Sequence, residues 1–293
     1  MRLSFALLLL VPSASFAQTK EIDDAVKAKL AAARWVLARE VATGGFALTA
    51  KDTKPGLRST SGAVRALRYL GAEVPNKDRH AAFVLSCYDP KTGAFAEPGG
   101  KPDVTITAVG VMAAAELGVP KEKYAKALPY LKASARTFED VRIGAAAVEA
   151  WGVKDCPFPL NDWFLIAATD AGTKLLGNAA DGGARDIASV NAMYLRLGKA
   201  GVDTAQILPH LRDGQRADGG WGKKGEKASD IESTYRVMRA FHLLNEKPKD
   251  VAKLREFVGK HRNADGGYAT KPGEASSMSG AYYAAIVTAW AKD

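Results

Sequence analysis

The sequence predicts an all-α fold, an α/α toroid with six inner and six outer helices. A turn that recurs along the chain and an alternation of two kinds of helix lead to this prediction. The 293 residues are 47% apolar and 25% charged, a composition that excludes wholesale disorder and supplies a large core. No apolar run reaches the ~20 residues that a membrane-spanning helix needs. The net charge of +9 comes from scattered Lys and Arg and does not by itself indicate a nucleic-acid partner.

The recurring unit is a Gly-Gly-aromatic turn, with Ala as the second residue in one copy. A polar loop and an Ala-rich apolar run follow each turn, and Gly or Asn after the run signals the end of a helix. We expect the glycines to adopt positive φ angles and the aromatic side chains to pack each loop against the neighbouring hairpin. The four copies are Gly44-Gly45-Phe46, Gly93-Ala94-Phe95, Gly219-Gly220-Trp221 and Gly266-Gly267-Tyr268.

Each repeat is predicted to be a helical hairpin with an amphipathic first helix and a second helix that is apolar nearly all round. The first helices are expected at residues 22–39, 80–86, 124–133, 162–175, 205–215 and 251–261. The second helices are expected at residues 59–70, 104–117, 139–151, 187–197, 231–244 and 277–291. An open solenoid would need polar capping repeats at its ends. Because the last helix is apolar, we expect the hairpins to close into one ring-shaped domain over residues 18–293.

Residues 1–17 have the pattern of a signal peptide. Arg2 precedes a short apolar stretch, and small residues precede a predicted cleavage between Ala17 and Gln18. We therefore expect an exported protein, either periplasmic or secreted. In such a compartment Cys87 and Cys156 are able to form a disulfide. The alternative is two buried free thiols.

The residue pattern of the repeat resembles that of the prenyltransferase/squalene-cyclase family. The pattern is Asp-Gly-Gly-aromatic, a loop, Asp, Thr four residues later, an apolar run and Leu-Gly. It is clearest in residues 87–118 and 216–290, and the resemblance extends over about residues 22–290. The family includes protein prenyltransferase β subunits and class II triterpene cyclases, which are α/α toroids. The resemblance implies an isoprenoid or another apolar ligand in the lumen of the ring.

The resemblance also implies two kinds of chemistry, and this chain lacks key residues for both. The β subunits hold zinc with Asp-x-Cys at the start of one inner helix and a His in the last repeat. At the corresponding positions this chain has Asp230, then Glu232 in place of Cys, and Gly280 in place of His. We therefore expect no zinc cofactor of the family's kind. The cyclases protonate their substrate from an Asp-x-Asp-Asp cluster, which the repeats of this sequence do not contain. Whether a reaction is catalysed stays open.

Polar side chains at the starts of the inner helices are the candidate site residues. The candidates for catalysis are Asp103, Asp230 and Glu232, and those for ligand binding are Asp230, Glu232, Tyr235 and Tyr282. The acids also suit helix caps, with Ser229 as the N-cap and Glu232 at N3 of a capping box. We expect the other lumen-facing residues to be mainly Ala, Val, Thr and Ser. A basic rim for an anionic head group is a further hypothesis, with Arg58, Arg65, Arg68, Lys223, Lys224, Lys227 and Arg236 as members.

Two other functions remain open beside the binding of an apolar ligand. One is a non-catalytic interaction module that binds a protein partner of the cell envelope. The other is a carbohydrate-active enzyme that uses paired carboxylates, such as Asp103 and Glu232. A deep apolar lumen would favour the ligand binder, and a filled lumen would favour the interaction module. An open cleft with two carboxyl groups and aromatic platforms would favour the enzyme.

Overall fold

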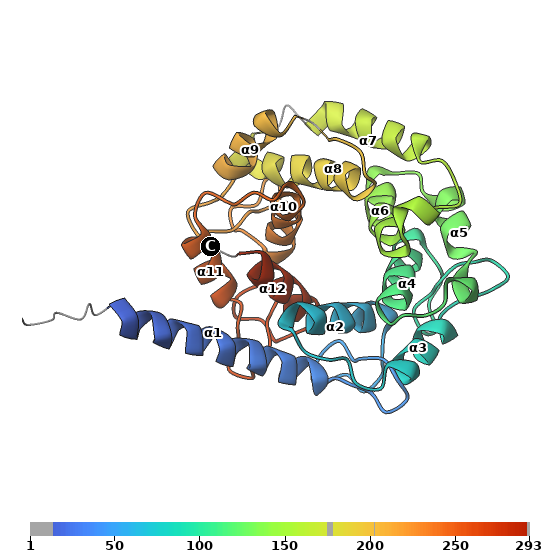
Figure 1. Ribbon diagram of the computed structural model, residues 1–293, viewed down its shortest axis with the longest axis horizontal. Coiled ribbons are helices and arrows are strands. Elements are labelled where there is room, and N and C mark those ends of the chain that lie inside the picture. Colours follow the sequence, from blue (N-terminus) through green and yellow to red (C-terminus); the bar gives the residue numbers. More distant parts are fainter. Residues whose placement is uncertain (1–13, 175–177, 202, 292–293) are drawn as a thin grey trace, which may run out of the picture.

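The computed structural model describes residues 14–174, 178–201 and 203–291. It shows a ring of helices around a central lumen (Figure 1). Residues 1–13, which make up most of the predicted signal peptide, lie outside the described part. The predicted cleavage point between Ala17 and Gln18 falls inside the first helix, α1 (Ala14–Leu37).

The inner layer of the ring consists of α2 (Leu57–Leu70), α4 (Val104–Glu116), α6 (Phe138–Trp151), α8 (Ala184–Arg196), α10 (Ile231–Leu244) and α12 (Met278–Trp290). Each of these helices packs against the next one along the chain. The last, α12, packs against α2, so the ring is closed (Figure 1). This arrangement confirms the predicted all-α toroid.

The outer layer consists of α1, α3 (Lys77–Ser86), α5 (Ala127–Ser134), α7 (Asn161–Lys174), α9 (Thr204–Asp213) and α11 (Val251–Gly259). Three short elements complete the described chain: the 3₁₀ turns η1 (Lys121–Tyr124) and η2 (Val153–Asp155), and a π-helical turn, η3 (Ala179–Gly183). The observed bounds agree with the predicted ones to within a few residues for most helices. The main exception is α1, which begins at Ala14 and not at the predicted Ile22.

The Gly-Gly-aromatic turns fix each loop to its inner helix. The backbone N–H of Phe95 donates to Thr107 Oγ1 at 3.1 Å, and that of Trp221 donates to Thr234 Oγ1 at 3.1 Å. This bond explains why Thr recurs four residues after the helix-capping Asp. Phe46, Phe95 and Trp221 are almost fully buried, in agreement with the predicted packing role, whereas Tyr268 is half-buried. Gly219 has a φ of 94°, and a Cβ atom there would lie 2.1 Å from a backbone oxygen of α11, so the turn requires glycine.

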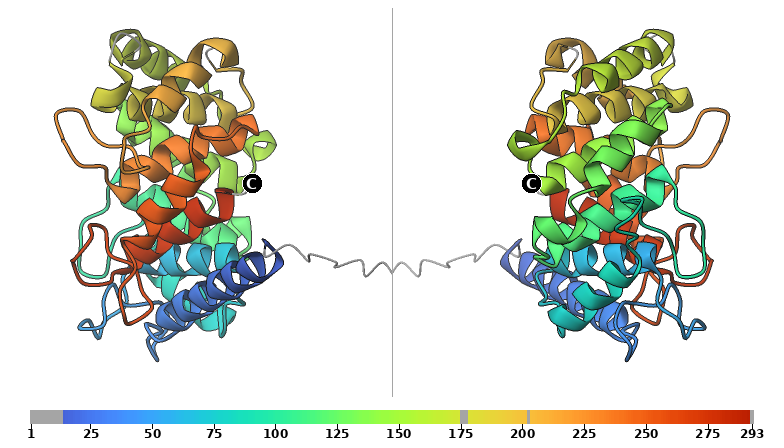
Figure 2. Two further views of the ribbon diagram at one scale, coloured as in Figure 1. Left: turned by 90° about the vertical axis from the view of Figure 1, so that its left-hand side faces the viewer. Right: turned by 90° about the vertical axis from the view of Figure 1, so that its right-hand side faces the viewer.

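The long loops that follow these turns project from one end of the ring (Figure 2). They lead into the N-termini of the inner helices, so these helices run in the same direction around the lumen. None of the described helices is long and apolar enough to span a bilayer. Cys87 and Cys156 are both free thiols in the structure, as in the second of the two predicted alternatives, but they are half-buried and not fully buried.

Candidate ligand-binding site

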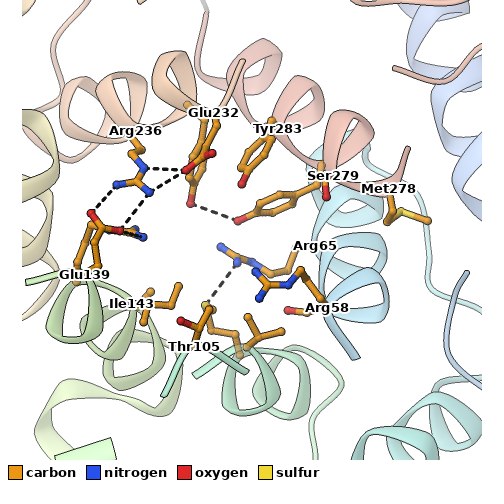
Figure 3. A pocket seen from close by; sticks show the side chains of 18 of the residues that line it. Arg58, Arg65, Thr105, Glu139, Ile143, Glu232, Arg236, Met278, Ser279 and Tyr283 are labelled. Atoms are coloured by element: carbon orange, nitrogen blue, oxygen red, sulfur yellow. Dashed lines mark hydrogen bonds and ion pairs between the residues drawn. The ribbon is translucent and has the colours of Figure 1, made fainter. Parts of the chain in front are cut away.

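A cavity of about 360 Å³ opens in the lumen between the inner helices. All six of them contribute side chains to its wall, among them Arg65 of α2, Glu139 of α6, Arg196 of α8 and Tyr235 of α10. Figure 3 shows polar and charged side chains pointing into this space. The volume lies in the range of small-molecule sites, about 300–1,000 Å³.

The structure separates the predicted site residues into two groups. Glu232, Tyr235 and Tyr282 line the cavity. Asp103 and Asp230 do not, because each is the N-cap of its inner helix. The carboxylate of Asp103 accepts from the backbone N–H of Ile106 at 2.7 Å. Asp230 and Glu232 are therefore close in sequence but lie in different environments.

The N-cap of α10 lies one residue later than predicted, and the predicted capping box does not form there. The N-cap is Asp230, whose carboxylate accepts from the Ser233 backbone N–H at 2.8 Å and from the Ser233 hydroxyl at 2.7 Å. Ser229, the predicted N-cap, donates instead to Asp218 at 2.8 Å. Asp is as good an N-cap as Ser, and here it takes that position. Glu232 is left free of capping and points into the lumen (Figure 3).

One part of the cavity wall is a network of balanced charges. Arg236 lies between two glutamates and donates to Glu232 at 2.8 Å and to Glu139 at 2.9 Å. Arg142 donates to Glu139 as well, at 3.0 Å. Burial acts to raise the pKa of Glu139, but Arg142 and Arg236 outweigh it and hold this pKa at about 2. Burial also opposes ionisation of Glu232, and Arg236 nevertheless lowers its pKa. Both carboxyl groups are thus ionised.

A second part of the lumen holds more cations than anions. Arg65, Arg196 and Arg239 surround Tyr235 from α2, α8 and α10. Arg196 and Arg239 are only 8% and 7% exposed. Arg196 lies 3.4 Å from the carboxylate of Glu149. Within the described part of the chain, neither Arg65 nor Arg239 has a carboxylate within ion-pair distance.

These two arginines are instead held by aromatic and sulfur contacts. Arg65 lies over the ring of Tyr282 at 4.9 Å and reaches Met112 Sδ at 3.5 Å. Arg239 lies over the ring of Trp290 at 4.4 Å, and its Nε is buried with no hydrogen-bond partner. Cation–π contacts stabilise a guanidinium group but leave its charge uncompensated. An anion would supply the missing partner.

The charged lumen corrects the expectation of a wall made mainly of Ala, Val, Thr and Ser. The basic-rim hypothesis was correct for three of its residues, because Arg58, Arg65 and Arg236 line the cavity. Arg68 instead pairs with Glu116. The three lysines of that hypothesis, Lys223, Lys224 and Lys227, are exposed on a loop.

Four further lumen residues were not singled out from the sequence: Glu139, Arg142, Arg196 and Arg239. One signal was available for them. The inner helices are otherwise apolar, so each arginine within them needs a polar environment. In a closed ring of hairpins the lumen provides such an environment.

The residues present do not fit a zinc ion of the family's kind. The Asp230 carboxylate is used in capping α10. A Cβ atom at Gly280 would lie 2.2 Å from the backbone oxygen of Tyr268, so no side chain fits there without a backbone shift. Across residues 14–174, 178–201 and 203–291, no group of three or more His, Cys, Asp or Glu residues is arranged to hold a metal ion.

Comparison with known proteins places this architecture in a family. No curated protein sequence matches the chain significantly. The sequence does match the family model of the prenyltransferase alpha-alpha toroid domain, over residues 5–150 and 185–291. These matched segments contain most of the inner helices and most of the cavity wall. The chain belongs to the prenyltransferase alpha-alpha toroid family.

Proposed function

We propose that this toroid is an exported protein that binds a small molecule in its lumen, an isoprenoid or another apolar compound that carries an anionic group. The observation that carries the proposal is the surplus of cations in the wall. Arg65 and Arg196 both line the cavity, and Glu149 is the one carboxylate paired with this cluster in the described structure. A buried guanidinium without a counter-ion is costly. An anionic ligand would remove that cost on binding.

The rest of the wall suits the apolar part of such a ligand. Val109, Met112, Ile143 and Met278 line the same cavity as the arginines. Apolar walls with a few well-placed polar groups are typical of small-molecule sites. The mixture favours an amphiphilic ligand over a wholly apolar one.

The two alternative functions receive less support from the same geometry. A carbohydrate-active enzyme needs one protonated carboxylic acid next to a second carboxylate. Glu139 and Glu232 are both ionised by Arg236, and Asp103 is a helix cap. A pure interaction module was expected to have a filled lumen, whereas this lumen holds a cavity.

A binding experiment with matched ligands tests the proposal. Geranyl diphosphate and geraniol share the apolar part and differ in the anionic group. We expect the diphosphate to bind more tightly in isothermal titration calorimetry. Replacing Arg65 by Gln would weaken diphosphate binding by about 10- to 100-fold, since a hydrogen bond to a charged group contributes roughly 1.5–3 kcal/mol. The alcohol would lose much less.

Arg68 supplies the control because it lies on the same helix, is exposed and pairs with Glu116 at 3.0 Å outside the cavity. Arg68→Gln should leave the affinity unchanged. Equal affinity for the alcohol and the diphosphate would contradict the proposal. An Arg65→Gln variant that binds the diphosphate as tightly as the wild type would contradict it as well.

A further inference from the structure

Tyr235 occupies the centre of the cationic part of the lumen. Its hydroxyl lies 3.3 Å from Arg239 Nη2 and 3.3 Å from the Tyr282 hydroxyl. Its ring stacks on Trp290, with centroids 6.0 Å apart and an interplanar angle of 17°. The phenol group is thus held on two sides, and the residue also forms part of the cavity wall.

Charged and titratable groups face Tyr235 from every inner helix packed around it. Arg239 of α10, Arg196 of α8, Arg65 of α2 and the α12 tyrosines Tyr282 and Tyr283 act on Tyr235 directly. Further charged groups line the same cavity, namely Arg58 at the loop end of α2, Glu232 and Arg236 on α10, and Glu139 and Arg142 on α6. Tyr69 of α2 and Glu149 of α6 act on Arg239. The two glutamates and two arginines of the balanced network neutralise one another. Around Tyr235, the remaining charges are three guanidinium groups and one carboxylate.

The hydrogen bonds around the phenol oxygen favour loss of its proton. Arginine has donors and no acceptor, so the Tyr235 oxygen accepts from Arg239. Among the described residues, the acceptor within reach of the Tyr235 proton is the Tyr282 oxygen, which carries a proton of its own. Burial opposes ionisation, but the charges of Arg239, Arg196 and Arg65 outweigh it and hold the pKa of Tyr235 well below its ordinary range. Burial raises the pKa of Tyr282, which therefore stays protonated.

We propose that Tyr235 is the exchangeable counter-ion of the lumen, ionised in the ligand-free protein and protonated when an anionic ligand binds. This inference rests on the proposed function. Before binding, the phenolate compensates part of the guanidinium charge. After binding, the ligand anion takes over that role, and its negative charge raises the proton affinity of the phenolate. One proton moves from solvent to the Tyr235 oxygen, and no other bond changes.

Such coupling makes binding depend on pH. Where Tyr235 is ionised in the free protein, uptake of one proton lowers the affinity for an anion by up to about tenfold for each unit of rising pH. Tyr235→Phe removes the competing phenolate. The variant should therefore bind anions more tightly than the wild type at high pH, and its affinity should vary much less with pH.

The first measurement needs no ligand. The near-ultraviolet band of tyrosinate is followed during a pH titration of the ligand-free wild type, Tyr235→Phe and Tyr130→Phe. Tyr130 lies on the outer helix α5 and serves as the control. We expect one tyrosine to ionise well below the others in the wild type and in Tyr130→Phe, and this early step to be missing in Tyr235→Phe. A wild type without an early step would overturn the proposal.

The second measurement uses hexyl sulfate, an anion with an apolar tail whose charge is constant across the working pH range. Calorimetry in two buffers with different ionisation enthalpies gives the number of protons taken up. We expect an uptake approaching one per site in the wild type and close to zero in Tyr235→Phe. Tight binding without proton uptake would overturn the coupling and leave the proposed function intact. If neither protein binds any of the anionic ligands, the proposed function fails, and the tyrosinate titration still decides the state of Tyr235.

Discussion

Gly280 offers a sharp test of the packing at the start of α12. The family resemblance implied a zinc-binding histidine at this position, and Gly280 lies in the first turn of an inner helix. A Cβ atom built on it would lie 2.2 Å from the carbonyl oxygen of Tyr268 and 2.7 Å from the carbonyl carbon of Ala269. Both obstacles are backbone atoms, which cannot rotate away as a side chain would.

Gly280→Ala should therefore destabilise the protein, although alanine is the better helix former. In an open helix position the exchange would gain about 0.5–1 kcal/mol. Overpacking of a dense site costs roughly 1–3 kcal/mol, and a backbone obstacle favours the upper part of that range. We expect a net loss of about 2 kcal/mol, which lowers the melting temperature by roughly 3–4 °C in a domain of this size.

Gly259→Ala is the matched control, because Gly259 ends α11 and a Cβ atom there would have no neighbour within 4 Å. Thermal unfolding followed by circular dichroism compares the two variants with the wild type. The control should keep or slightly raise the melting temperature. A Gly280→Ala variant as stable as the wild type would refute the reasoning. Gly280→His should be less stable still and should bind no zinc in metal analysis of the purified protein.

Three further predictions concern charge and reactivity. Burial and the charge of Arg239 lower the pKa of Arg196, although Glu149 raises it. Arg196→Met should therefore leave the free energy of unfolding in urea unchanged or raise it by about 1 kcal/mol. A clear loss of stability would contradict this expectation. The Glu139 carboxylate stabilises the fold above pH 4.5, and this contribution disappears as the pH falls towards 2. Because its side chain is 53% exposed, Glu139→Gln should cost only about 1 kcal/mol at pH 7 and nothing near pH 2. Burial raises the pKa of Cys87 to about 11. At neutral pH, iodoacetamide should therefore alkylate Cys87 about a hundredfold more slowly than it alkylates cysteine in an unfolded peptide. Equal rates would argue against this burial.

Local signals explain which helices could be predicted accurately from the sequence. The bounds of α10 were predicted as observed because both ends carry such signals. Asp230 caps the first turn, and Asn245 ends the helix with a φ of 55°. The start of α3 was predicted too late because Asn76, its N-cap, has a φ of 47° and forms no side-chain cap. An N-terminus without a capping bond has no pattern that sequence reasoning can find.

The site was harder to predict than the fold because it depends on closure of the ring. Along a helix that is apolar nearly all round, periodicity does not separate the lumenal face from the faces packed against neighbours. Arg65 and Arg236 were noticed as basic residues, but their partners come from other helices. The bond between Arg236 and Glu139 joins residues 97 positions apart. No local pattern encodes a contact at such a separation.

The positions of the charges along the inner helices also explain where an anion would bind. Helix N-termini attract anions, but at the loop end of this ring the chain supplies its own carboxylates. Glu97 accepts from the backbone N–H groups of Leu57 and Arg58 at 2.6 and 2.8 Å, and aspartates cap α4 and α10. An external anion would have to compete with these groups.

At the other end of the lumen, along the C-terminal halves of the inner helices, arginines are available to an anion. Arg65 and Arg239 lie beyond the middle of α2 and α10, and Arg196 is the last residue of α8. Arg196 lies in the last turn of α8, where the helix dipole favours a cation. Near the loops, the lumenal glutamates are thus paired with Arg142 and Arg236, whereas at depth the described structure gives Arg65 and Arg239 no carboxylate partner. Under the proposed function, the anionic group of a ligand would lie at the basic end beside Tyr235, and its apolar part would extend towards the loops.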